Sequence, residues 1–278
     1  MTGTIADLHI HTYYSDGTMS PEEILNTALL KGVAVLAVTD HDVLEGTLEL
    51  QQLCQNHDIK YISGVELDSL DHGNNVHILG YGMDLKNKEF LDFVHQNRTK
   101  LDTVNSMLIE KMQEDYVNIS VTDYMNYTYD RAKGGWKALH YLMEKGLTDS
   151  LREGFAFYPK YNCTYQCVNF LSVEEVCRYI HNAGGKAVLA HPGVSIKEED
   201  IHIFKKELLR FISYGLDGIE CYYPTHKNDI TAICLQICKE QDLLITCGSD
   251  CHGTFGFAEV GQTNTPISKL NLKGIPGI

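Results

Sequence analysis

The chain has 278 residues, of which 44% are hydrophobic, and its 37 acidic residues outnumber 23 basic ones, giving a formal net charge of −14. This length suits one large domain, or one domain that carries an insertion. Apolar runs are too short for a membrane helix, the first residues lack a secretory pattern, and the charge disfavours duplex DNA as a partner. We expect a cytoplasmic protein that binds neither membranes nor duplex nucleic acid.

Cysteine and histidine are both frequent in this chain. The nine cysteines form an odd set without the paired spacing of a zinc ribbon or a disulfide scaffold, so we expect reduced thiols. Thirteen histidines is a high count for this length. Where the histidines lie along the predicted elements therefore becomes the main question.

Short apolar runs of strand length recur, with helical patterns between several of them. The expected strands are Ile5–His9, Val35–Thr39, Tyr61–Glu66, Val76–Tyr81, Ala187–His191, Gly218–Tyr222 and Leu244–Ser249. The expected helices of this alternating part are Pro21–Lys31 after an N-cap Ser20, Glu45–His57, Val173–Ala183 after an N-cap Ser172, and Asp229–Gln241. Helices that follow strands favour a parallel arrangement, and seven such units fit an α/β barrel, in which catalytic residues come from the carboxyl ends of strands.

Residues 90–171 interrupt this alternation. They show mostly helical periodicity, with expected helices over Phe90–Gln113 and Trp136–Lys145, the latter ending before Gly146. We interpret them as an inserted helical subdomain, and residues 1–89 and 172–278 as the barrel domain.

Polar residues that can bind metal stand at the ends of the expected strands. In the first strand a period of two directs His9 and His11 to one side, where two imidazoles can chelate one ion. Taken alone, this His-x-His pattern could be accidental. Asp16 lies in a following turn, and His41 ends an apolar run that would otherwise finish in a surface residue.

Later strands add similar residues. A carboxylate at Glu66 would be costly to bury unless it bound a cation, and its two oxygens could bridge two ions. His77 could instead be an ordinary core histidine. The candidate metal ligands are His9, His11, Asp16, His41, Glu66, His77, His191, Asp250 and His252.

This set of six imidazoles and three carboxylates suits Mn²⁺, Fe²⁺ or Zn²⁺ better than Ca²⁺. Nine ligands are too many for one ion, so two or three divalent ions are implied. Their charge would exceed that of the three carboxylates and leave a local positive field for a phosphate.

The candidate ligands lie in motifs that occur in this order: Asp7–Asp16, Thr39–Asp42, Gly64–Glu66, His77, His191–Pro192 and Gly248–His252. These motifs, in this order, resemble those of the PHP family, named for its polymerase and histidinol phosphatase members. The chain most resembles the small bacterial branch of nucleotide phosphatases. The resemblance implies a distorted seven-stranded, TIM-like barrel and three ions. It implies His9, His11, Glu66 and Asp250 on the first ion, Glu66, His77 and His191 on the second, and Asp16, His41 and His252 on the third. Asp7, Asp40 and Asp42 would orient imidazoles, or act as caps.

The chain departs from this branch of the family within the predicted insert, which would cover the bound substrate. Where that branch usually has Gly-Arg-Pro-His, this chain has Gly134-Gly135-Trp136-Lys137, so two groups expected to hold a second phosphate are absent. Arg98, Arg131, Lys137 and His226 are the candidate substrate contacts, with ordinary surface charge as the alternative reading.

We therefore expect metal-dependent hydrolysis of a small phosphoester, a nucleotide or a related monoester, by a hydroxide that bridges two ions, with Glu66, His191 and His252 as catalytic residues. Alternative substrates are a cyclic phosphodiester, a sugar phosphate, histidinol phosphate or a short oligonucleotide end. Rival functions are a non-catalytic metal-binding module and hydrolysis of a C–N bond. The sequence predicts no oligomeric state.

Overall fold

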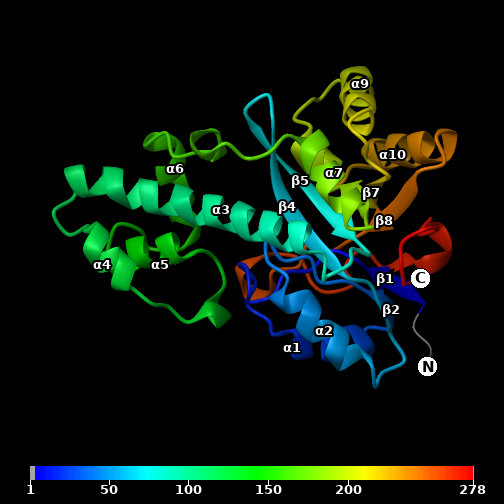
Figure 1. The fold of residues 1–278 in the computed structure, drawn as a ribbon, viewed down its shortest axis with the longest axis horizontal. Helices are drawn as coiled ribbons and strands as arrows, with labels where there is room; N and C mark the ends of the chain where they lie inside the picture. The colour runs from blue at the N-terminus through cyan, green and yellow to red at the C-terminus, as the bar shows by residue number, and fades with distance from the viewer. Residues whose placement is uncertain (1–3, 278) are drawn as a thin grey trace.

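The computed structural model describes residues 4–277, which form a mixed α/β fold with a helical extension (Figure 1). The strands are β1 Ile5–Asp7, β2 Val33–Leu36, β3 Lys60–Tyr61, β4 Gly64–Asp71, β5 Asn74–Tyr81, β6 Lys186–Leu189, β7 Gly218–Tyr222, β8 Leu244–Cys247 and β9 Thr265–Pro266. The α-helices are α1 Pro21–Leu30, α2 Glu45–Cys54, α3 Lys88–Asp115, α4 Val121–Asn126, α5 Lys137–Glu144, α6 Phe157–Lys160, α7 Val173–Asn182, α8 Pro192–Ser195, α9 Ile201–Ile212 and α10 Asn228–Glu240. The 3₁₀ turns are η1 Arg131–Lys133, η2 Arg152–Ala156, η3 Tyr165–Val168, η4 Gly253–Phe255 and η5 Ile267–Lys269.

The strands form two sheets, with the orders β3-β2-β1-β9 and β4-β5-β6-β7-β8. Parallel bridges join the sheets at two places, Ile10 with Cys251 and His41 with Glu66. The mixed α/β class is thus confirmed, but the described strands do not form one closed barrel. Both bridges lie beside predicted metal ligands, so the junction of the sheets is where those ligands meet.

The third and fourth expected strands differ from the prediction. The run Tyr61–Glu66 is divided between β3 and β4, and β4 continues to Asp71 and pairs antiparallel with β5. The turn between them contains His72 and Gly73, both with positive φ. The parallel arrangement predicted here is therefore wrong, and Glu66 and His77 lie within an antiparallel hairpin rather than at carboxyl ends of strands.

Side-chain alternation in β4 explains how this hairpin serves the site. Val65 and Leu67 are fully buried in the largest hydrophobic core, whereas Glu66 and Asp68 lie on the opposite face of the strand. A period of two therefore turns the two carboxylates away from the apolar core and toward the predicted ligands.

The capping predictions are confirmed. Ser20 and Ser172 each accept a hydrogen bond from the third residue of the following helix, and Glu23 and Glu175 complete the two capping boxes. Helices α1 and α2 cover one sheet, and α7 and α10 pack on the other (Figure 1). Helix α9 was not predicted.

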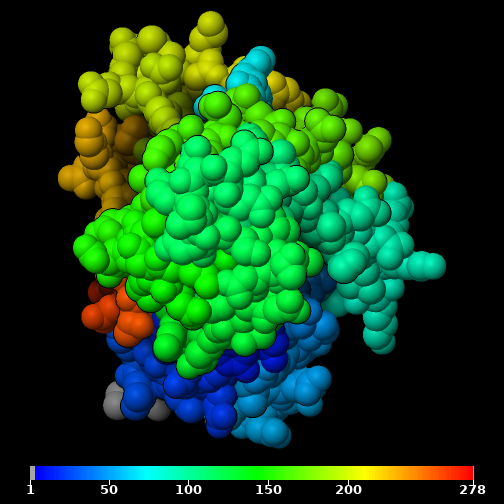
Figure 2. All heavy atoms as spheres, turned by 90° about the vertical axis from the view of Figure 1, so that its left-hand side faces the viewer, coloured from blue at the N-terminus to red at the C-terminus, as the bar shows by residue number. Residues whose placement is uncertain are grey.

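Residues 90–171, the predicted insert, begin within the long helix α3. Phe90 and Phe93, near its start, belong to the main core, whereas Leu108 and Met112, near its end, belong to a separate core with Tyr141 of α5. Both predicted insert helices are present. The insert extends beyond the sheets in Figure 1 and covers much of the face seen in Figure 2. Among the described residues, no helix has the length and apolar character needed to cross a membrane.

Candidate metal centre

All nine predicted ligands meet at the junction of the two sheets. His9 and His11 follow β1, Asp16 lies in the next turn, His41 follows β2, Glu66 and His77 come from the β4–β5 hairpin, His191 follows β6, and Asp250 and His252 follow β8. Each of these nine positions is separated from at least one partner by a complete strand or helix. The centre therefore forms only when the whole fold is assembled.

The carboxylate of Glu66 is the hub of this centre and is only 1% exposed. Its Oε2 lies 3.1 Å from His9 Nε2, 3.1 Å from His11 Nε2 and 3.5 Å from His41 Nε2. Its Oε1 lies 2.9 Å from His77 Nδ1 and 3.1 Å from His191 Nε2. One carboxylate thus faces five imidazoles, with each oxygen serving a different set.

The set at Glu66 Oε2 is completed by Asp250. Its Oδ1 lies 3.3 Å from His9 Nε2 and 3.1 Å from His11 Nε2. The four ligand atoms lie within 4.8 Å of one another, as the shared coordination of one ion requires. At the other oxygen, the ring nitrogens of His77 and His191 are 3.3 Å apart, so these two side chains converge on Oε1.

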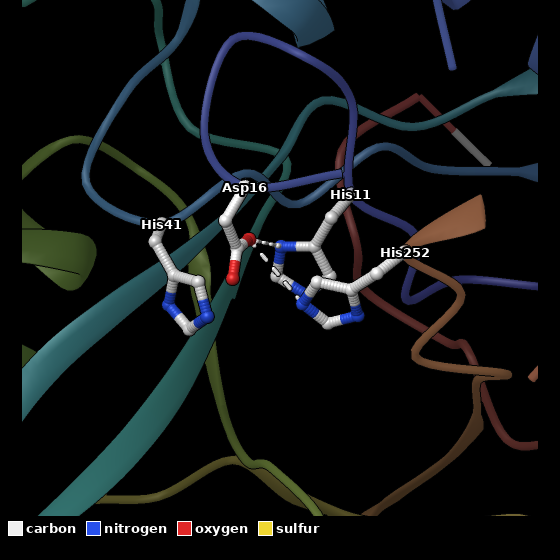
Figure 3. A group of neighbouring side chains, drawn as sticks. All are labelled: His11, Asp16, His41 and His252. Atoms are coloured by element: carbon white, nitrogen blue, oxygen red, sulfur yellow. Dashed lines mark ion pairs between the residues drawn. The ribbon is translucent and has the colours of Figure 1, made fainter. Parts of the chain in front are cut away.

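A third group consists of His11, Asp16, His41 and His252 (Figure 3). Asp16 Oδ1 lies 3.3 Å from His252 Nε2 and 3.8 Å from His11 Nδ1. The rings of His11 and His252 stack with centroids 4.0 Å apart. His11 therefore belongs to two groups, one at each ring nitrogen.

Three buried atoms of the third group make no hydrogen bond to any described residue: His11 Nδ1, His41 Nδ1 and Asp16 Oδ1. Such atoms are costly to bury unless something else binds them. Imidazole nitrogens and carboxylate oxygens are ligands for borderline divalent ions, so the donor set fits metal ions. These residues could hold ions in three adjacent groups.

Close carboxylates control the protonation of the buried histidines. Burial disfavours a charged imidazole, but Glu66 and other carboxylates outweigh burial and hold the pKa of His9 and of His77 well above its ordinary range. For His11, Asp250 and Glu66 overcome burial and raise the pKa to about 10. Without metal, protons on these rings balance the carboxylates.

His41 differs from its neighbours. Burial lowers its pKa to about 4, and the attraction of Glu66 does not compensate. The carboxylates of Glu66 and Asp250 also lie in buried surroundings, yet the neighbouring histidines hold their pKa well below the usual range. His41 is therefore neutral and could serve as a ligand without losing a proton, and both carboxylates stay ionised.

Two orienting carboxylates escaped the sequence analysis. Glu220 of β7 is fully buried; its Oε1 lies 3.1 Å from His9 Nδ1, and its Oε2 accepts a hydrogen bond of 2.8 Å from the His191 backbone N–H. Asp68 Oδ1 lies 3.1 Å from His77 Nε2. The available signal for Glu220 was a carboxylate within the apolar strand pattern Gly218–Tyr222, the same argument that identified Glu66.

We expect Glu220→Gln to weaken metal binding by about 10- to 100-fold, because partners of this kind fix the orientation and basicity of a ligating imidazole. The amide keeps the shape but removes the charge opposite His9. Titration of the metal-free protein with Mn²⁺ measures the effect. Glu22→Gln, an exposed position on α1, is the control, and equal affinities in the two variants would contradict this role.

The backbone around the centre is tightly constrained. His191 and Asp250 adopt positive φ values of 30° and 54°, which non-glycine residues rarely do and which recur at functional sites. At Gly248, a Cβ atom would lie 2.1 Å from His9 Cβ and 2.4 Å from Glu220 Oε1. Only glycine fits between these two side chains.

The three neighbouring aspartates accept hydrogen bonds from the backbone, and Asp40 and Asp42 accept further ones from nearby side chains. Asp7 accepts hydrogen bonds from the N–H groups of Ser249 and Gly261, and burial raises its pKa to about 6. Asp40 accepts from Thr12 N–H. Their contacts agree with capping, the second of the two roles predicted for them. Asp42 accepts from the Asp68 N–H and from Asn97 of α3.

The four candidate substrate contacts separate into two pairs. Arg98 packs over the ring of Trp136, whose indole lies 5.9 Å from the His41 ring, and one guanidinium nitrogen of Arg98 is buried without a hydrogen bond to a described residue. Burial raises the pKa of Tyr129, the charges of Arg131 and Arg98 oppose that rise, and Asp16 adds to it. Both arginines therefore lie close enough to Tyr129 to affect its pKa, as Asp16 does.

The other two candidates are engaged elsewhere. Lys137 donates to the Met125 carbonyl and lies over the ring of Tyr124. His226 has one ring nitrogen against the Cys221 carbonyl and accepts from Gly193 N–H with the other. These contacts occupy the side-chain nitrogens of both residues, so these nitrogens are not directed at the metal centre. His226 instead holds the loop after His191 through its contact with Gly193 N–H.

A buried cluster of imidazoles and carboxylates at the junction of two sheets is typical of hydrolases that cleave phosphoesters with bound divalent ions. The chain belongs to the PHP family: the model described as "PHP domain" matches residues 7–209. It is therefore a phosphoric ester hydrolase, and the resemblance found in its motifs is confirmed.

Several characterised proteins are similar over most of their length. The chain is 27% identical over 261 residues to a phosphoribosyl 1,2-cyclic phosphate 1,2-diphosphodiesterase of Eggerthella lenta, covering 91% of this chain and 95% of that protein. It is 25% identical to the 5′-3′ exoribonuclease Rnm of Escherichia coli (93% and 88%) and 26% identical to a 3′,5′-nucleoside bisphosphate phosphatase of Chromobacterium violaceum (92% and 90%). These relatives share the family and differ in substrate.

The fold also matches that of a crystal structure from Bifidobacterium adolescentis, assigned as a metal-dependent phosphoesterase. The TM-score is 0.79 at 24% identity, over 96% of this chain and 94% of that one. The match covers the insert as well as the two sheets. The arrangement of the elements is therefore shared along almost the entire chain.

Proposed function

We propose that the protein hydrolyses a small phosphoester, a nucleotide or a related phosphate monoester, in a reaction that requires divalent metal. The observation that supports this most directly is the Glu66 carboxylate, buried and within 3.5 Å of five imidazole nitrogens. Such an arrangement of charge and lone pairs suits adjacent cations that share one carboxylate. A phosphate group would be the natural anionic ligand of these cations.

The proposed cofactors are two or three ions of Mn, Fe or Zn. His9, His11, Glu66 and Asp250 would hold the first, Glu66, His77 and His191 the second, and Asp16, His41 and His252 the third. The ligand atoms of His41, Glu66 and His77 also lie within 4.8 Å of one another, so His41 could join the second group, and His191 Nε2 lies 3.1 Å from Glu66 Oε1. When bound, such ions lower the pKa of water and stabilise the charge that develops on phosphoryl oxygens.

The catalytic residues we propose are Glu66, His191 and His252. Glu66 keeps two groups of ligands at a fixed separation through its two oxygens. His191 is oriented by Glu220 through a backbone hydrogen bond and lies 3.1 Å from Glu66, and His252 lies 3.3 Å from Asp16. A substrate bound between His191 and His252 would contact both histidines.

We further propose that the two sheets act as a distorted, TIM-like seven-stranded barrel with residues 90–171 as a substrate cap. The two bridges between the sheets and the hydrogen bond from Leu8 N–H to the Cys247 carbonyl support the first point. For the cap, Gly135 N–H donates to the Asp16 carbonyl, which ties the insert to a predicted ligand. Arg98 and Arg131 are the proposed phosphate contacts.

Hydrolysis of a cyclic phosphodiester is the second candidate. The similarity to the Eggerthella lenta enzyme, over 91% of this chain, favours it, and the metal groups could serve a diester as well as a monoester. A 5′ end of a short oligonucleotide is a related possibility suggested by the Escherichia coli relative. For the cellular location, nine free cysteines favour the reducing cytoplasm.

The test is phosphate release by the Mn²⁺-loaded protein from nucleotides, nucleoside bisphosphates, cyclic phosphates, sugar phosphates and histidinol phosphate. We expect metal-dependent release from the nucleotide class. Cyclic substrates should be followed by chromatography, because ring opening alone frees no phosphate. A protein with verified bound metal that cleaves none of these compounds would favour the non-catalytic metal-binding module.

A further inference from the structure

A cavity of about 350 Å³ opens beside the metal centre, between the insert and the segment after β8. Asp250 and His252, two of the proposed ligands, form part of its lining. The lining also includes Arg152 of η2 and the aromatic residues Phe255 and Phe257. A group bonded to a phosphate at the centre can therefore extend directly into this cavity.

The aromatic wall is open to solvent. The side chain of Phe257 is 87% exposed, and Phe155 of the insert, also in the lining, is 41% exposed. The ring of Phe255 lies 6.4 Å from that of His252, so the wall begins next to the metal centre. Exposed rings at the mouth of a polar centre are suited to stack against a planar aromatic ligand.

Arg152 adds a positive charge to this wall. Its guanidinium lies 4.3 Å from the ring centre of Phe257 and donates a 2.7 Å hydrogen bond to the Phe255 carbonyl. No carboxylate within residues 4–277 pairs with it. In a chain with a net charge of −14, this cation keeps N–H groups for the acceptor atoms of a ligand.

The contact between insert and sheets brings the two halves of the cavity together. Arg152 comes from the insert, and Phe255 and Phe257 come from the segment after β8, which appears in orange beside the green insert in Figure 2. Gly135 of the insert lies against the Phe255 ring, where a Cβ would be 3.0 Å from the nearest ring atom. The wall therefore depends on the insert being docked.

We infer that this cavity is the subsite for the nucleobase of a nucleotide substrate, with Phe257 as the stacking surface and Arg152 as the partner for acceptor atoms of the base. This inference rests on the proposed phosphoesterase function and adds the residues that would recognise the base of the substrate. A sugar phosphate, which lacks an aromatic ring, would leave Phe257 unused.

The experiment compares adenosine 5′-monophosphate with ribose 5-phosphate in the Mn²⁺-loaded wild-type, Phe257→Ala and Arg152→Ala proteins. We expect Phe257→Ala to raise KM for the nucleotide by about tenfold, as for the loss of one base–aromatic stack. Its kcat/KM for ribose 5-phosphate should stay unchanged. Arg152→Ala should act in the same direction, and Leu30→Ala, which truncates an exposed apolar residue of α1, is the control.

Adenosine binding, measured by calorimetry, separates this inference from the proposed function. If the wild-type protein cleaves phosphoesters but Phe257→Ala changes the two substrates equally or not at all, the nucleobase subsite is overturned and the hydrolase stands. If the wild-type protein cleaves no phosphoester, yet binds adenosine and loses that binding in Phe257→Ala, the subsite stands and the proposed reaction is wrong.

Discussion

Glu66→Ala is expected to reduce kcat/KM for any phosphoester substrate by at least about a thousandfold. Loss of one preorganised charge-stabilising group typically costs 10²- to 10³-fold, and Glu66 serves two ligand groups at once. The carboxylate faces His9, His11 and His41 with one oxygen and His77 and His191 with the other. Its removal therefore disturbs five of the eight other predicted ligands, all except Asp16, Asp250 and His252.

Glu66→Gln refines this experiment. It keeps the side-chain volume, so a fold intact by circular dichroism would attribute the loss to charge rather than to a cavity. Glu89→Ala, at an exposed position in the first turn of α3, is the control and should keep wild-type rates. Wild-type turnover in either Glu66 variant, with metal verified, would refute the centre as the site of reaction.

Removal of metal is expected to abolish activity and to lower thermal stability, with both restored by Mn²⁺. An ion present at a thousandfold excess over its Kd adds about 4 kcal/mol to the free energy of unfolding. The metal-free protein must retain protons in the centre instead, because carboxylates raise the pKa of His9 and His77 far above the ordinary value, and that of His11 to about 10. Those protons have to leave when an ion binds.

The direction of the pH dependence follows from these raised pKa values. A histidine whose folded-state pKa is raised stabilises the metal-free fold fully below its unfolded pKa of about 6.5, and this contribution is lost as the pH rises toward the folded value, about 10 for His11. We expect the melting temperature of metal-free protein to fall over that window. Apparent metal affinity should rise with pH over the same range.

Calorimetric titration in two buffers of different ionisation enthalpy measures the protons released per ion. Release should be clear at pH 7, and the Mn²⁺-loaded protein should show a flatter melting profile toward pH 9 than the metal-free protein. Absence of proton release, together with identical melting profiles in both forms, would mean that the imidazoles do not bind the metal.

The sequence predicted which residues the fold brings together at the junction of the sheets, because several of them stand two apart at the ends of expected strands. His9 and His11 alternate at the end of a strand, and Asp250 and His252 do the same after β8, so the chemistry is visible before the fold is known. The caps at Ser20 and Ser172 were equally local and were correct. Local patterns of this kind predict which residues assemble and which helices begin where they do.

Pairing between strands carries no comparable signal. Glu66 was expected at the end of a parallel strand, whereas β4 passes through it and pairs antiparallel with β5. Whether β4 pairs parallel or antiparallel depends on the turn at His72–Gly73 and on the packing of Val65 and Leu67. Sequence periodicity alone does not reveal either of these. For that reason the class of fold was predictable, but its strand directions were not.

Contacts between distant segments were also beyond the sequence. Glu220 reaches His9 across 211 residues, and Arg152 meets Phe255 across 103. Lys137 and His226 looked suitable by residue type, but their nitrogens bind nearby groups of the chain. Residue type identifies what a side chain can do, and only the packed fold determines what remains available to it.

Strand β1 has a consequence for the synthesis of the protein. It pairs with β9, with Ile5 opposite Pro266, and Leu8 N–H donates to the Cys247 carbonyl. One edge of β1 must therefore wait for its partner until β9 has been translated. At about 5–20 residues per second, that wait is roughly 13–50 s. During translation one edge of β1 can pair with β2 early, but the edge that later pairs with β9 stays open to wrong partners until residues 265–266 have been made.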